Sequence, residues 1–221
     1  DDPRSTWGLT EGNPLWEDLR SAARLAKPHF LLNVALNRDK AITAVFAGQW
    51  EAAHARGCAW VKQRAMVPVE GPFDIVLTSN SGYPLDLNLY QAVKGMHAAA
   101  LVVKRGGSIL IAAECWDGIP EHGAFGELLA RASSPEELLR TVREPGFSRE
   151  DMWEAQLLAL VRQKARIYLY SDGLSDRQIR AAHLEPCRSI EDLLAALLRE
   201  YGPGARICVL PQGPQTIPYL K

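Results

Sequence analysis

Short apolar runs alternate with longer segments of helical periodicity along this chain, and this alternation restricts the fold more than any other feature. FDIVLT (residues 73–78) and SILIAA (residues 108–113) each follow a glycine-containing turn. Strands that are apolar on both faces need cover on both faces, as in the parallel sheets of α/β proteins. The sequence therefore predicts an α/β fold, a three-layer sandwich in which helices cover both faces of a predominantly parallel sheet.

The other elements are predicted from apolar spacing and from the positions of glycine and proline. Helices are expected over residues 15–26, 50–64, 89–103, 127–131, 135–142, 152–163 and 189–201. Strands are expected over residues 28–37, 41–48, 166–171 and 206–211. The first of these strands has the pattern of a buried strand, residues 37–40 that of a hairpin turn, and Arg105-Gly106-Gly107 that of a glycine cap on the preceding helix. The last strand–helix–strand unit predicts parallel pairing.

Composition argues against several classes of protein. The chain has 221 residues, 47% of them hydrophobic, and a net charge of -1, which gives no electrostatic reason to expect nucleic acid or a membrane as partner. It contains no run of about 18 apolar residues and no basic leader, so neither a membrane span nor a signal peptide is expected. The cysteines lack zinc-ligand spacing, which predicts reduced thiols in a cytoplasmic protein. They are Cys58, Cys115, Cys187 and Cys208.

The domain organisation follows from the ends of the chain. The first residue is Asp and not Met, so we expect the chain to start inside a longer product. Residues 1–14 are polar and end in the turn Gly12-Asn13-Pro14, and we interpret them as a linker from a missing N-terminal domain. Residues 15–221 are expected to form one α/β domain.

One segment, residues 78–95, has the residues of a binding site. It begins at the carboxyl end of a predicted strand, which is where open α/β sheets bind ligands, and it runs into a helix. The unpaired N–H groups of a helix start favour a carboxylate or phosphate. Either Asp86 or Asn88 is the expected N-cap of that helix.

Three polar side chains follow in the first two turns of this helix. Tyr90 and Lys94 are four residues apart, and Gln91 and Lys94 three apart, so all three can share one face. A phenol, an amide and an ammonium together suit a small hydroxy-carboxylate. The same spacing is more common on an ordinary solvated face with an aromatic edge, and the signal is not diagnostic.

Several stretches resemble the C-terminal domain of the nickel-dependent lactate racemase family. The most specific is SNSGYPLDLNLYQAVKGMHAAA (residues 79–100), in which a GYP-D-N-YQAVKGM pattern is a family hallmark. Four others are similar in the same order. They are NVALNRDKAITAVFAG (33–48), EAAHARGCAWVK (51–62), GGSILIAAECWDG (106–118) and DMWEAQLLALV (151–161).

The resemblance implies a 2-hydroxy-acid racemase or epimerase. Its cofactor is a nickel-pincer nucleotide tethered to a lysine, its reaction is reversible hydride transfer from C2 of the substrate, and paired histidines move the hydroxyl proton. Substrate and cofactor lie between an N-terminal and a C-terminal domain. The chain is therefore expected to be the C-terminal, substrate-contacting half, inactive alone, with the missing domain or another copy of the chain covering its exposed interface.

The family's C-terminal site residues correspond here to Tyr90, Gln91, Lys94 and Trp153. The resemblance implies that Lys94 pairs with the substrate carboxylate or polarises the keto oxygen, and that Gln91 bonds the same oxygens. Tyr90 and Trp153 are expected to wall the pocket. Without the resemblance, Trp153 is equally well interpreted as a core aromatic of an amphipathic helix.

Other residues depart from the family pattern. The tether lysine, the nickel-ligand histidine, the proton-moving histidines and the Asp-His-x-Arg-Pro segment belong to the family's N-terminal half and have no counterpart here, so no metal ligand is assigned in this chain. Ser81 stands where glycine is usual, and Cys115-Trp116 is bulkier than usual, which puts lactate itself in doubt. The chain's own histidines are dispersed, without a pair at metal-ligand spacing. They are His29, His54, His97, His122 and His183.

Two alternatives remain open. One is a stand-alone binding or regulatory domain that keeps the hydroxy-acid pocket without its chemistry. The other, a Rossmann-like nucleotide-binding enzyme, is disfavoured because no GxGxxG or P-loop follows a predicted strand.

The reading frame upstream of residue 1 distinguishes the racemase from the stand-alone domain. For the racemase we expect it to encode Asp-His-x-Arg-Pro and several histidines. An initiator methionine directly before residue 1 would contradict this expectation. Sequencing the parent gene is the measurement.

Overall fold

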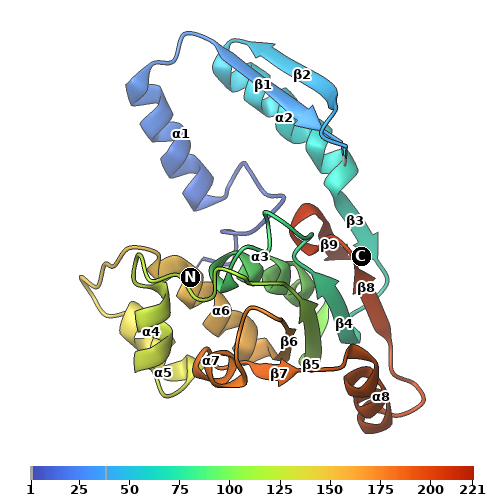
Figure 1. Ribbon diagram of the computed structural model, residues 1–221. Helices are drawn as coiled ribbons and strands as arrows, with labels where there is room; N and C mark the ends of the chain where they lie inside the picture. The colour runs from blue at the N-terminus through green and yellow to red at the C-terminus, as the bar shows by residue number, and fades with distance from the viewer. Residues whose placement is uncertain (1, 38) are drawn as a thin grey trace. The chain divides into compact units, whose positions relative to one another are not determined.

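The computed structural model describes residues 2–37 and 39–221. The chain divides into two compact units, Asp1–Val67 and Pro68–Lys221 (Figure 1). The expectation of a linker over residues 1–14 and one domain over 15–221 stays a prediction. The expected turn at residues 37–40 includes Arg38, which lies outside the described residues.

The first unit consists of helix α1 (Pro14–Ala26), the antiparallel hairpin of β1 (Leu31–Leu36) and β2 (Ile42–Gly48), and helix α2 (Trp50–Ala65). Asn13 caps α1 by accepting from the backbone N–H of Leu15. The inner face of the hairpin packs on α2, where the rings of Phe46 and Trp60 meet edge-on with centroids 6.1 Å apart. These helices and strands confirm the sequence predictions.

The expectation that the first strand is buried was wrong. Four of the six residues of β1 are exposed. A two-stranded hairpin has two faces, and within this unit α2 covers only one of them. The apolar run therefore predicted correctly that these residues form a strand, but not that the strand is exposed.

The second unit is built on a five-stranded sheet in the order β7-β6-β5-β4-β8 (Figure 1). All four pairings are parallel, as predicted. The strands are β4 (Phe73–Ser79), β5 (Val103–Ala112), β6 (Ala165–Tyr170), β7 (Glu185–Cys187) and β8 (Ile207–Leu210). Their carboxyl ends meet at one edge of the sheet, which is where a ligand site is expected.

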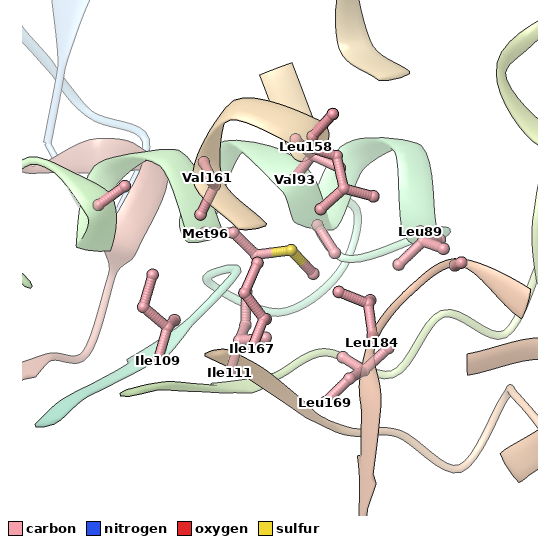
Figure 2. Packing of buried hydrophobic residues seen from close by; sticks show 14 of the residues in the cluster. Leu89, Val93, Met96, Ile109, Ile111, Leu158, Val161, Ile167, Leu169 and Leu184 are labelled. Carbon is pink, nitrogen blue, oxygen red and sulfur yellow. The ribbon is translucent and has the colours of Figure 1, made fainter. Parts of the chain in front are cut away.

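Helices flank this sheet. The helices of the second unit are α3 (Leu89–Ala100), α4 (Phe125–Arg131), α5 (Pro135–Val142), α6 (Met152–Lys164), α7 (Asp176–Ala181) and α8 (Ile190–Tyr201). Figure 2 shows the core beneath α3 and α6, in which Val93 and Met96 of α3 face Ile109 of β5 and Ile167 of β6. The side chain before Ile109 on β5 is Ser108, which points to the opposite face of the sheet. Its hydroxyl lies 2.9 Å from the phenol of Tyr201 on α8.

The sequence did not predict five short elements. These are β3 (Met66–Val69), α7, β7, the 3₁₀ turn Gly213–Gln215 and β9 (Ile217–Leu220). Each has only three to six residues, and none of them is a continuous apolar run like those of the predicted strands. At the end of the chain, the backbone N–H of Lys221 donates to the carbonyl of Val69.

The predicted glycine cap at Arg105-Gly106-Gly107 was wrong. Helix α3 ends at Ala100, and β5 already begins at Val103, which pairs with Phe73. Gly106, at φ +77°, lies inside β5 where the register with β4 shifts. The run from Ala98 to Val103 is apolar throughout, so no polar residue marks where the helix ends and the strand begins.

Gly95 lets α3 lie directly on the end of β4. A Cβ at this position would approach the Asn80 Oδ1 at 2.8 Å and the Ser79 carbonyl oxygen at 3.1 Å. We expect Gly95→Ala to lower the free energy of unfolding by roughly 1–3 kcal/mol, because the clash outweighs the better helix propensity of alanine. Urea denaturation measures the change.

Gly204→Ala is the matched control, because a Cβ there would meet nothing within 4 Å. Its free energy of unfolding is expected to stay within about 0.5 kcal/mol of the parent value. Equal stability of the two variants would contradict the close approach of α3 to β4.

Candidate functional site

The buried amide of Asn80 organises the loop between β4 and α3. Asn80 is 1% exposed and follows the last residue of β4. Its Nδ2 donates to the carbonyls of Leu85 and, at 3.0 Å, Gln91, and its Oδ1 accepts from the Gly95 N–H at 2.9 Å. One side chain therefore ties the strand end, the loop and the first turns of α3 together.

Asn88, and not Asp86, is the N-cap of α3. The Asn88 Oδ1 accepts from the Gln91 N–H at 3.1 Å, and its Nδ2 donates to Asp117 at 3.2 Å. Asp86 is also buried, and it accepts from the Glu114 N–H at 3.2 Å. The loops that follow β4 and β5 are thus joined at the carboxyl edge of the sheet.

Tyr90, Gln91, Lys94 and Trp153 lie together at this edge, and we call them the four-residue cluster. The Lys94 ammonium donates to the Gln91 Oε1 at 2.6 Å and lies 5.8 Å from the centroid of the Tyr90 ring. The Tyr90 ring meets Trp153 edge-on with centroids 5.8 Å apart. Helical spacing predicted the two contacts within α3, and the packing of α6 on α3 adds the contact with the tryptophan.

The cluster is partly open to solvent. Trp153 is 51% exposed, so it is not a core aromatic of this unit, while Tyr90, Gln91 and Lys94 are half-buried. Burial and then the nearby charges of Asp151 and Glu154 raise the pKa of Tyr90 to about 12. The phenol therefore stays protonated at neutral pH and donates to the Asp151 carboxylate at 3.4 Å.

Glu154 is a candidate site residue that the sequence did not predict. It follows Trp153 in α6, is 0% exposed, and neither carboxyl oxygen has a hydrogen-bond partner among the described residues. Burial raises the pKa of this carboxyl to about 8, the Lys94 charge opposes the rise, and Asp151 adds to it. The sequence did contain a signal of its burial, because Glu154 lies four and seven residues before the buried Leu158 and Val161, on the same face of the helix.

The histidines are not members of the four-residue cluster. His54 stacks on Trp16 with ring centroids 6.3 Å apart, and the His183 Nε2 lies 3.1 Å from the Leu129 carbonyl oxygen. Burial lowers the pKa of His97 to about 4. Across the described part of the chain, no three His, Cys, Asp or Glu residues gather as a metal site. No helix there has the length and apolar character needed to cross a membrane.

A comparison with known families identifies the domain that carries the sheet. The model of the lactate racemase C-terminal domain matches residues 69–217, which cover the sheet, α3 and α6. The chain belongs to the lactate racemase family.

Relatives extend the match beyond that domain. The lactate racemase of Thermoanaerobacterium thermosaccharolyticum is 35% identical over 219 residues, which are 97% of this chain and 50% of the relative. The lactate racemase of Lactiplantibacillus plantarum is 36% identical over 215 residues, 96% of this chain and 50% of the relative. The chain thus spans about half the length of these relatives.

Two solved structures are similar. The lactate racemase apoprotein from T. thermosaccharolyticum superposes with a TM-score of 0.92 at 34% identity, covering 98% of this chain and 52% of that one. A protein from Thermotoga maritima reaches a TM-score of 0.65 at 13% identity, covering 95% of this chain and 54% of that one, which indicates a shared fold alone.

The buried carboxyl makes stability depend on pH. The pKa of Glu154 is near its ordinary value of 4.5 in the unfolded chain and about 8 in the folded protein, so stability falls as pH rises from 4.5 to 8 and then levels off. Glu154→Gln removes this loss. We expect the stability of the variant relative to the parent to grow by about 1.4 kcal/mol per pH unit across that window, measured by urea denaturation.

The pH dependence of this stability difference is the test. Burying an amide in place of the carboxyl can also change the stability of the variant, but by the same amount at every pH. Glu137→Gln is the control, since Glu137 bonds the exposed Ser133 at the protein surface. A parent-to-variant difference for Glu154→Gln that is flat between pH 4.5 and 8 would show that Glu154 is ionised in the folded protein.

Proposed function

We propose that the whole protein is a racemase or epimerase of 2-hydroxy acids and that this chain is its substrate-contacting half. Membership of the lactate racemase family supports the reaction class. The observation that supports the role of this chain is the four-residue cluster at the carboxyl edge of a parallel sheet. The inability of this half to turn over substrate alone is part of the proposal.

Each side chain of the cluster has a role that its chemistry allows. The Lys94 ammonium pairs with the substrate carboxylate or with the oxygen at C2, since these oxygens carry the negative charge of the substrate and of the reacting centre. Gln91 already accepts from Lys94, and its amide N–H group donates to the same substrate oxygens. The protonated Tyr90 and the half-exposed Trp153 form an aromatic wall that orients the acid.

The proposed cofactor is the nickel-pincer nucleotide. When bound, it supplies the acceptor for the hydride that leaves C2 and returns. The amide, ammonium, phenol and indole of the cluster fit the substrate beside such a group and not the nickel, for which imidazole is a suitable ligand. In this proposal the chain binds and orients the acid, and the preceding half supplies the nickel ligand, the tether lysine and the histidines that move the hydroxyl proton.

The proposed partner of this chain is that preceding half. The outer face of the β1–β2 hairpin is apolar and exposed, with Leu32 66%, Leu36 55% and Val45 58% accessible. Val34 and Val45 are directly opposite each other on this face. A contiguous exposed apolar face marks a site of association.

A variant of Lys94 tests the proposed activity. Full-length protein loaded with cofactor is offered enantiopure lactate, malate and bulkier 2-hydroxy acids in turn. We expect the parent enzyme to racemise or epimerise at least one of them at C2. Lys94→Ala is expected to lower kcat/KM at least about 100-fold, because the charged donor that pairs with the substrate is lost. Cofactor content, measured by absorbance, is expected to stay unchanged.

Lys62→Ala is the control, since Lys62 is exposed on α2, outside the cluster. Its kcat/KM is expected to match the parent. Parent protein that binds these acids without scrambling any of them would favour the stand-alone binding domain, and full activity in Lys94→Ala would remove Lys94 from the site.

A charge on the hairpin face tests the proposed partner. In full-length protein, Val45→Lys is expected to lower the free energy of unfolding by roughly 2 kcal/mol, because the side chain leaves an apolar contact with the preceding half. Val61→Lys on α2, where the valine is 43% exposed, is the matched control and is expected to be neutral. Equal effects of the two substitutions would argue against the hairpin as the interface.

A further inference from the structure

Glu154 is the strongest unexplained feature of the described residues. Its carboxyl group is completely buried one residue after Trp153, and neither oxygen has a hydrogen-bond partner among the described residues. A buried polar group without a partner is costly, and each such group in a native protein calls for an explanation, of which a role in catalysis is one. The position therefore needs a reason beyond packing.

The charged groups around Glu154 come from two helices. On α3, the positive charge of Lys94 lowers the pKa of the Glu154 carboxyl. The charge of Glu154 in turn raises the pKa of the Tyr90 phenol. Directly before α6, the N-cap residue Asp151 is the nearby anion. His97, one turn beyond Lys94, has a pKa lowered to about 4 and is neutral above that pH. Helix α4 contributes apolar side chains to the core here, among them Phe125.

Two states of Glu154 have opposite effects on Lys94. When Glu154 is a neutral acid, it does not compete for the Lys94 ammonium, which can then pair with the carboxylate of a bound substrate. An ionised Glu154 forms an internal ion pair with Lys94 and competes with the substrate for it. In a buried site the competition is strong because the dielectric constant is low.

We propose that Glu154 is a positioning residue that, by remaining a neutral acid behind Lys94, keeps the ammonium available to the carboxylate of the substrate. The proposal rests on the proposed function of the cluster and deepens it. Ionisation releases the Glu154 proton to solvent and draws Lys94 toward the protein interior. Substrate binding, and not the chemical step, is the stage at which the enzyme loses efficiency in alkali.

Kinetics of the full-length, cofactor-loaded enzyme test the proposal. Between pH 7 and 9 we expect the KM of the parent for its 2-hydroxy acid to rise about tenfold, since a carboxyl with a pKa of about 8 passes from mostly neutral to mostly ionised. In Glu154→Gln the KM is expected to stay flat, because the amide cannot ionise. The ratio of parent to variant kcat is expected to stay constant with pH.

A purely structural role of Glu154 would change stability or kcat without giving a KM ratio that depends on pH. The same pH dependence of KM in parent and variant would overturn the proposal. Glu137→Gln, at the surface, is the matched control and is expected to behave as the parent.

A second measurement separates this proposal from the proposed racemase activity. In full-length protein without cofactor, labelled with 13C at glutamate Cδ, we expect the resonance absent from Glu154→Gln to titrate near pH 8. Lys94→Met is expected to move that midpoint up by a pH unit or more, because the opposing positive charge is gone. Lys104→Met is the control, since Lys104 pairs with Asp74 at 2.7 Å.

A Glu154 midpoint near 4.5, or one that Lys94→Met leaves unmoved, overturns the coupling of the two residues whether or not any hydroxy acid is turned over. A midpoint near 8 that shifts in Lys94→Met, together with failure to scramble every acid offered, supports the coupling and rejects the racemase. The two hypotheses therefore fail separately.

Discussion

The hydrogen bonds of Asn80 are the interaction on which the site depends. This buried amide binds the carbonyls of Leu85 and Gln91 and the N–H of Gly95, and so fixes where α3 starts relative to the end of β4. A donor or acceptor left unpaired at this depth costs about 1–3 kcal/mol, which is why the arrangement is specific. The arrangement also needs a residue without a side chain at position 95.

The electrostatics of the cluster follow from that arrangement. With α3 held in place, α6 packs against it and buries Glu154 in the vicinity of Lys94. Burial disfavours charge on the carboxyl and on the Tyr90 phenol, so both stay protonated near neutral pH and Lys94 is the principal charge of the cluster. An ammonium among neutral polar side chains, with the nearest carboxylate, Asp151, bonded to Tyr90, is suited to a small monoanion.

Much of the fold could be predicted from local pattern. The strands at FDIVLT and SILIAA, the helix between them and the parallel sheet were all confirmed, because continuous apolar runs between glycine turns have few alternatives. Prediction failed where pattern and context disagree. The apolar run from Ala98 to Val103 contains a helix end and a strand start, and the apolar hairpin strand β1 is exposed because α2 covers only one side of it.

Within the site, the sequence alone determined that Tyr90, Gln91 and Lys94 share a face, because 3.6 residues per turn dictates it once Asn88 begins the helix. The resemblance to a family added Trp153. Only the tertiary structure decided that this tryptophan contacts Tyr90 and that its neighbour Glu154 is buried without a partner. Helical period acts over a few residues, whereas contacts between residues far apart in the chain depend on how α6 packs on α3.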